Sequence, residues 1–121
     1  MIQALISWAP AGIWAVFLFF LSAQSEIPGA DSFSFPLNDK VAHFGLFAVL
    51  GTALAWGGRR SRGLSTHLVV LLLGAVFAAT DEWHQAFVPL RDPSLWDLAA
   101  DLAGLAVGYA LARLVFRPPK S

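Results

Sequence analysis

Four long runs of apolar residues, separated by short polar segments, dominate the chain. Within each run the apolar residues follow one another without alternating with polar ones, and each run has about the 17–25 residues that an α-helix needs to cross a bilayer. The runs cover residues 4–23, 41–58, 64–80 and 95–116. With their polar ends included, they predict four transmembrane helices at approximately residues 4–24, 40–58, 64–85 and 95–116.

The composition supports this interpretation. Of the 121 residues 57% are hydrophobic and only 13% are charged, against about 25% charged in an average soluble domain. Because the connecting segments are short, we predict an all-α fold in which residues 1–121 form a single four-helix bundle within the membrane. The chain has no cysteine, which excludes a disulfide and a thiolate metal site. Nothing in the sequence indicates nucleic-acid binding, and the partner we expect is the lipid bilayer.

The charged residues separate by sign along the chain. All eight acidic residues lie in or beside the segments that link the first run to the second and the third to the fourth. Six of the eight basic residues lie between the second and third runs or at the C-terminus, and only Lys40 and Arg91 lie among the acids. Cytoplasmic loops of membrane proteins carry an excess of Lys and Arg. We therefore expect a multi-pass protein of the bacterial inner membrane, with both termini cytoplasmic and the acidic residues on the extracytoplasmic side.

Ionisable residues at the edge of hydrocarbon are costly unless they pair, bind a ligand or line water. The segment 81–101 holds five of the eight acidic residues and lies between two apolar runs. If the polar ends of three helices converge, they surround one outward-facing cleft with Lys40 and Arg91 at its rim. The residues of this cleft would be Asp39, His43, Asp81, Glu82, His84, Gln85, Asp97 and Asp101.

The fourth run carries a pattern of small residues that favours close helix packing. Gly104 and Gly108 form a GxxxG motif, and helical spacing places Asp97 and Asp101 on the same face. The two acids are therefore predicted to point into the bundle rather than toward lipid. The glycine face suits a neighbouring helix of the same chain, and it suits a homodimer equally well.

Several polar motifs in the connecting segments form a recognisable set. They are Ser22-x-Gln24-Ser25-x-x-Pro28, Asp39-Lys40-x-x-His43-Phe44, Asp81-Glu82-x-x-Gln85-x-Phe87-x-Pro89-x-Arg91 and Ser94-x-x-Asp97-x-x-x-Asp101-x-x-Gly104. With these motifs the sequence resembles, over essentially its whole length, the VanZ-like family of small bacterial membrane proteins, named for resistance to the glycopeptide teicoplanin. The resemblance implies a transmembrane bundle linked to the cell envelope and its antibiotics.

Two positions depart from the family pattern. The family usually has Asn where this chain has Asp101, and many members have Tyr where this chain has Phe47. The first departure adds a carboxylate and favours either proton sharing or a cation site. The second removes a hydroxyl group, so no role for a tyrosine at that position can apply to this chain.

The leading functional hypothesis is a binding protein. Eight ionisable or amide groups at one end exceed what helix packing needs, because two or three interhelical hydrogen bonds would fix the register. The cleft would hold the polar head of a lipid or a lipid-linked precursor of the cell envelope, with a role in glycopeptide resistance or envelope homeostasis. The candidate ligand-binding residues are Gln24, Ser25, Asp39, Lys40, Asp81, Gln85, Arg91 and Asp101.

Two other hypotheses remain open at this point. The chain could be a membrane-embedded enzyme acting on an envelope lipid, with His43, Glu82 and Asp97 as acid–base or metal-assisted catalytic residues. The sequence establishes no cofactor, although a divalent cation is one option, with His43, Asp81 and His84 as candidate ligands. Alternatively, the polar residues stabilise the bundle, at about 0.6–2 kcal/mol for each interhelical hydrogen bond, and the function lies in protein partners.

The predicted topology can be tested with single cysteines, because the natural chain has none. A cysteine replacing Ser32 or Asp92 should react with a membrane-impermeant thiol reagent added to intact cells. A cysteine replacing Ser61 should react only after the cells are opened. The reverse labelling pattern would overturn the assignment of the acidic residues to the extracytoplasmic side.

Overall fold

The computed structural model describes residues 2–23, 38–61, 63–89 and 94–116, and the side chains of residues 38 and 39 are not described. The described residues form four helices and no strand. The helices are α1 (Ile2–Ser22), α2 (Asn38–Gly57), α3 (Leu64–Gln85) and α4 (Leu95–Val115). This confirms the predicted all-α fold, with every helix end within two residues of its predicted position.

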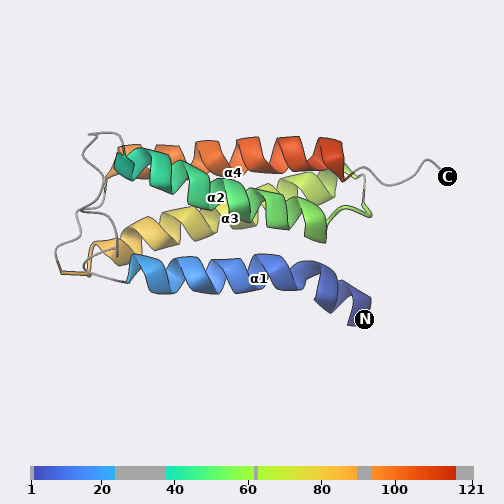
Figure 1. The fold of residues 1–121 in the computed structure, drawn as a ribbon, viewed down its shortest axis with the longest axis horizontal. Coiled ribbons are helices and arrows are strands. Elements are labelled where there is room, and N and C mark those ends of the chain that lie inside the picture. Colours follow the sequence, from blue (N-terminus) through green and yellow to red (C-terminus); the bar gives the residue numbers. More distant parts are fainter. Residues whose placement is uncertain (1, 24–37, 62, 90–93, 117–121) are drawn as a thin grey trace.

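The four helices lie side by side along one long axis (Figure 1). Each is long and apolar enough to cross a membrane. The start of α1 and the end of α4 lie at the same end of the bundle, as an even number of spans requires (Figure 1). Large apolar side chains such as Leu72, Val76 and Leu111 are more than half exposed on the outer surface, where a bilayer would cover them.

Local sequence signals set the helix ends. Ser94 has an extended backbone, and its hydroxyl group accepts a hydrogen bond from the Trp96 N–H at 3.1 Å, so Ser94 is the N-cap of α4. At the other end of α4, Arg113 donates to the carbonyl oxygens of Gly58 and Ser61 at 2.7 and 2.5 Å. Arg113 therefore ties the last turn of α4 to the segment that follows α2.

Glycines allow the backbones of α2 and α4 to touch. A Cβ atom at Gly104 would overlap the carbonyl oxygen of Phe44, and one at Gly108 would overlap that of Ala48. From the α2 side, a Cβ atom at Gly51 would overlap backbone atoms of α4 in the same way. The predicted close packing of the GxxxG face therefore occurs within one chain. That face is covered by α2, so a second copy cannot reach it while α2 and α4 stay together.

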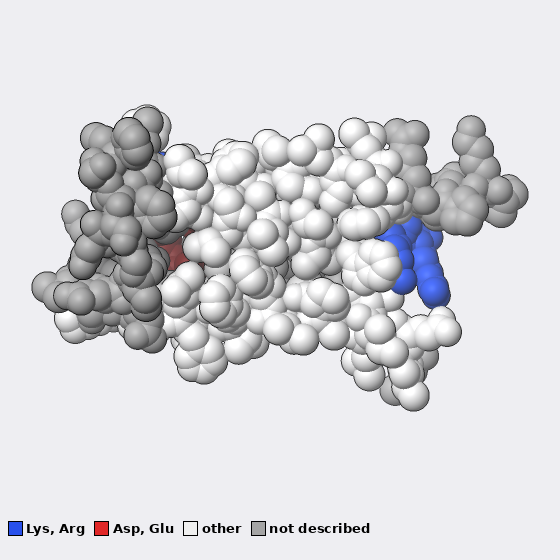
Figure 2. All heavy atoms as spheres, viewed as in Figure 1, with Lys and Arg blue, Asp and Glu red and all other residues white. Residues whose placement is uncertain are grey.

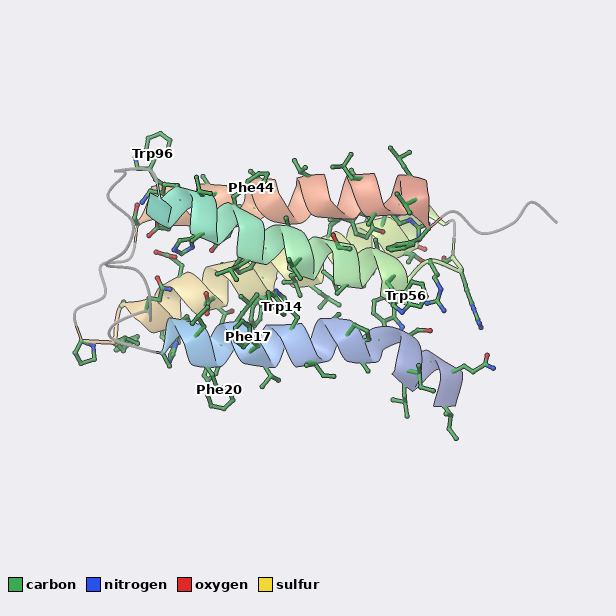
Figure 3. The ribbon with its side chains drawn as sticks, viewed as in Figure 1. Trp14, Phe17, Phe20, Phe44, Trp56 and Trp96 are labelled. Carbon is green, nitrogen blue, oxygen red and sulfur yellow. The ribbon has the colours of Figure 1, made fainter. Side chains whose placement is uncertain are left out.

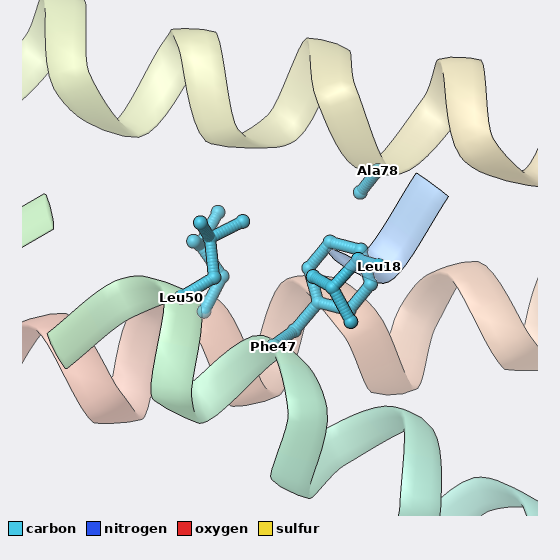
Figure 4. Packing of buried hydrophobic residues seen from close by; sticks show 5 residues of the cluster. Leu18, Phe47, Leu50 and Ala78 are labelled. Carbon is cyan, nitrogen blue, oxygen red and sulfur yellow. The ribbon is translucent and has the colours of Figure 1, made fainter. Parts of the chain in front are cut away.

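The rest of the bundle packs around this helix pair. One core cluster joins all four helices through Leu18, Phe47, Leu50, Ala78 and Leu105, and Figure 4 shows its packing. The indole N–H of Trp14 donates to the Leu46 carbonyl oxygen at 2.9 Å, which attaches α1 to α2. Trp56 and Trp96 lie toward opposite ends of the bundle (Figure 3), the levels at which tryptophan contacts the two membrane surfaces.

Replacement of Gly104 by alanine tests the contact between α2 and α4. Alanine favours helix formation by about 1 kcal/mol over glycine, yet Gly104→Ala should lower the free energy of unfolding by roughly 1–3 kcal/mol because the two backbones must move apart. Gly45→Ala on α2 is the matched control, since a Cβ atom there meets nothing within 4 Å. Denaturant titration in mixed micelles measures both variants. Equal stability of the two would contradict the described helix contact.

Candidate functional site

Polar side chains from three helices gather at one end of the bundle. This end is formed by the starts of α2 and α4 and the end of α3 (Figure 1). In Figure 2 a small red patch of Asp and Glu is visible at this end, whereas the blue Lys and Arg residues gather mainly at the opposite one. The buried members of this polar cluster are His43, Asp81, Glu82, Gln85, Asp97 and Asp101.

His43 and Asp101 form the centre of the polar cluster. His43 Nδ1 lies 2.7 Å from Asp101 Oδ1, and Asp101 is completely buried. The glycine contact explains why they meet, because Gly104 is one turn after Asp101 and touches the backbone of Phe44, the residue next to His43. The second oxygen of Asp101, Oδ2, is buried and has no hydrogen-bond partner among the described residues.

Asp97 connects this centre to the rim. Its Oδ1 atom forms an ion pair with Lys40 Nζ at 2.5 Å, and its Oδ2 atom lies 3.8 Å from His43 Nε2. The side chain of Lys40 is 36% exposed, whereas that of Asp97 is 6% exposed. Lys40 therefore occupies the boundary between the buried cluster and the surface, and its positive charge offsets that of Asp97.

Glu82 joins α3 to α4. Its Oε1 atom accepts a hydrogen bond from the backbone N–H of Ser94 at 2.5 Å. Its other oxygen, Oε2, is buried and has no partner in the described part of the chain. The sequence suggested Glu82 as a catalytic residue but did not predict its contact with Ser94, because the spacing along a helix does not show which backbone amide lies opposite.

Three of the ionisable residues are close enough to share one metal ion. His43, Glu82 and Asp101 each offer one donor atom, and these atoms lie within 4.8 Å of one another. This group shares His43 with the set that the sequence suggested, but it contains Glu82 and Asp101 in place of Asp81 and His84. The ring of His84 stacks instead on Phe19 of α1, with 4.7 Å between the ring centroids.

The rotation of α3 accounts for the difference. On a regular helix Asp81, His84 and Gln85 share one stripe. The buried residues of this turn are instead Asp81, Glu82 and Gln85, and His84 stacks on Phe19 of α1. The other predicted site residues cannot be placed in the same way. Gln24, Ser25 and Arg91 lie outside the described residues, and of Asp39 only its position as the second residue of α2 is described.

The cluster carries more negative than positive charge. Its described carboxylates are Asp81, Glu82, Asp97 and Asp101, whereas Lys40 is its described lysine and His43 its buried histidine. Like charges in a site of low polarity repel one another unless a proton, a basic side chain or a cation lies between them. The arrangement therefore suits the binding of a cation, of hydrogen-bond donors or of shared protons.

The ion pair between Lys40 and Asp97 can be measured with a double-mutant cycle. Lys40→Met leaves a buried carboxylate without this partner and should lower the free energy of unfolding by about 3 kcal/mol. Asp97→Asn should have a smaller effect, because the partly exposed Lys40 can turn to water. The double variant should be more stable than the sum of the single effects predicts, by roughly 0.5–3 kcal/mol. Strict additivity in denaturant titrations would show that the pair contributes nothing.

Comparison with known proteins assigns the chain to a family. The model of the VanZ/LLP1 family matches residues 7–116. The chain is also similar to an uncharacterized protein of Schizosaccharomyces pombe (strain 972), with 30% identity over 99 residues that cover 82% of this chain and 61% of that protein. The chain thus spans about three fifths of that relative's length. No solved structure matches the chain significantly. Because the matched residues include the whole polar cluster and at least most of every helix, the chain belongs to the VanZ/LLP1 family.

Proposed function

We propose that this multi-pass membrane protein binds the polar head of a lipid, or of a lipid-linked component of the cell envelope, at its polar cluster. The observation that supports the proposal most is the set of buried acceptors without partners, Asp101 Oδ2 and Glu82 Oε2, at one end of an apolar bundle. Burial of polar atoms without partners is unfavourable in a membrane protein, and a ligand that pairs with these atoms removes that cost. In this proposal the protein contributes to glycopeptide resistance or envelope homeostasis through that ligand.

The distribution of basic residues supports an extracytoplasmic site. Arg59 and Arg60 follow α2 and Arg113 lies in the last turn of α4, so all three are at the opposite end of the bundle from the polar cluster. Arg59 lies over the ring of Trp56, 3.6 Å from its centroid, and Arg60 donates to Gln3 at 3.2 Å. On the positive-inside rule, we propose that this end is cytoplasmic and that the polar cluster faces the outer leaflet of a bacterial inner membrane.

A purely structural role explains only part of the cluster. The contact of His43 with Asp101 joins α2 to α4, and that of Glu82 with Ser94 joins α3 to α4. Two such contacts are enough to fix three helices relative to one another. Each buried oxygen left without a donor costs roughly 1–3 kcal/mol, and an amide or apolar side chain would avoid that cost. A ligand that supplies donors or positive charge offsets it.

The position of Lys40 suggests how a headgroup would lie. Its partly exposed ammonium group stands at the rim, where a phosphate of the headgroup could contact it. Hydroxyl or amine groups of the same headgroup would donate to the carboxylates beneath. Because a relative occurs in a yeast, we define the ligand by this chemistry rather than by one antibiotic.

One observation favours an enzyme as the second candidate. His43 stands between two carboxylates, 2.7 Å from Asp101 and 3.8 Å from Asp97. A histidine oriented by a carboxylate is a common general base, so the site could hydrolyse or transfer a group of an envelope lipid. The substitution His43→Gln separates the two candidates, because it should abolish turnover by an enzyme but only weaken a binding protein.

Native mass spectrometry of the detergent-extracted protein tests the proposed function. We expect a phospholipid or polyprenyl phosphate to remain bound to the natural chain, and its occupancy to fall at least about tenfold in Lys40→Ala and in Arg91→Ala, as for the loss of a charge-assisted hydrogen bond. Arg60→Ala, which removes a cation at the opposite end, is the control. A bare natural protein, or equal lipid occupancy in all variants, would refute the proposal and leave the structural role.

A further inference from the structure

We infer that the polar cluster holds a divalent metal ion, with His43, Glu82 and Asp101 as its protein ligands. The inference deepens the proposed function, and it rests on that function in treating the cluster as a binding site rather than as a structural network. Each ligand comes from a different helix, so the ion would join α2, α3 and α4 at one point.

The distances fit a single ion. Metal–ligand bonds of roughly 2.0–2.6 Å for oxygen and nitrogen donors place two ligands of one ion at most about 4–5 Å apart. The donor atoms of His43, Glu82 and Asp101 lie within 4.8 Å of one another. No helix would therefore have to move far to bring the three donors onto a common ion.

A second observation points to a ligand independently of these distances. Asp101 is 0% exposed and Glu82 is 8% exposed, yet each has one carboxylate oxygen that meets no donor among the described residues. The other oxygens are engaged, since Asp101 Oδ1 contacts His43 and Glu82 Oε1 accepts from the Ser94 N–H. These contacts hold both carboxylates in place and leave an oxygen of each for the ion, which resembles the supporting hydrogen bonds around known metal ligands.

The charges in the cluster suit a dication. Lys40 offsets the charge of Asp97 through their ion pair. Glu82 and Asp101 have no such lysine or arginine partner within the described ranges, and an ion of charge +2 would match these two carboxylates. Without it, two buried like charges lie near each other, which is unfavourable.

The donor types narrow the identity of the ion. Two carboxylates and one imidazole form a mixed oxygen and nitrogen set, which suits Zn²⁺ or Mn²⁺. Ca²⁺ and Mg²⁺ are bound mainly by oxygen donors. Soft ions that select thiolate are not favoured, because the chain has no cysteine. We therefore assign the site to Zn²⁺ or Mn²⁺, with the remaining coordination positions available to water or to the headgroup.

Metal analysis of the full-length protein in detergent tests the assignment. The natural protein, stripped with a chelator and then dialysed against Zn²⁺ or Mn²⁺, should retain about one ion per chain, and its melting temperature should rise with the free ion concentration, as for any ligand of the folded state. Asp101→Asn and Glu82→Gln should each lower the affinity at least roughly tenfold. The environment of bound Mn²⁺ can be followed by electron paramagnetic resonance without any activity assay.

His67→Gln is the matched control. It removes one imidazole from α3, the helix that carries Glu82, but His67 contacts Tyr109 and is outside the three-residue group, so the ion should be retained. Two results would overturn the assignment: a natural protein that binds no stoichiometric ion and shows no thermal shift, or equal loss of the ion in His67→Gln and Asp101→Asn. Lipid measured in the same samples separates the two proposals, since an ion without lipid refutes only the proposed function and lipid without an ion refutes only the metal site.

Discussion

The backbones of α2 and α4 touch because glycines occupy the positions at which a side chain would hold the two helices apart. Lipid gives no hydrophobic driving force for association between helices in a membrane, so close van der Waals contact of small residues is the main attraction available. Gly104 and Gly108 place α4 directly against the carbonyl oxygens of Phe44 and Ala48. His43 and Asp101 then come within 2.7 Å of each other. The polar centre is therefore a geometric consequence of the glycine contact, and it would not survive a shift of one helix along the other.

The third helix is placed by different means. Gly74 lets Leu105 of α4 approach α3 closely, and Ala78 packs in the core cluster. At the polar end the hydrogen bond from the Ser94 N–H to Glu82 completes the attachment. This bond also satisfies one of the free N–H groups at the start of α4. The same side chain thus supports the helix start and faces the polar cluster, so changes at Glu82 affect both the fold and any ligand.

The sequence predicted those features that depend on neighbouring residues in the chain. Unbroken apolar runs predicted the four helices, and the glycine spacing indicated a closely packed face. The partner of that face was not predictable, because spacing on one helix does not show whether the facing helix belongs to the same chain. The rotation of α3 was not predictable for a similar reason, because spacing on one helix does not show which of its faces is buried. The adjacent residues Asp81 and Glu82 are in fact both buried. The contact of His67 with Tyr109 at 2.6 Å was also missed, because it joins residues 42 positions apart.

The two proposals depend on each other electrostatically. A phosphate placed directly among Glu82, Asp97 and Asp101 would be repelled, because Lys40 offsets only one of the three carboxylates. A divalent ion between His43, Glu82 and Asp101 would offset the charges of these two carboxylates, and a phosphate could then approach both the ion and Lys40. From the interior to the rim, the site would then contain the carboxylates, the ion and the ammonium group of Lys40. Anionic headgroups would require the ion, whereas headgroups with an amine would compete with it, so the metal content of the site would decide which class of lipid it accepts.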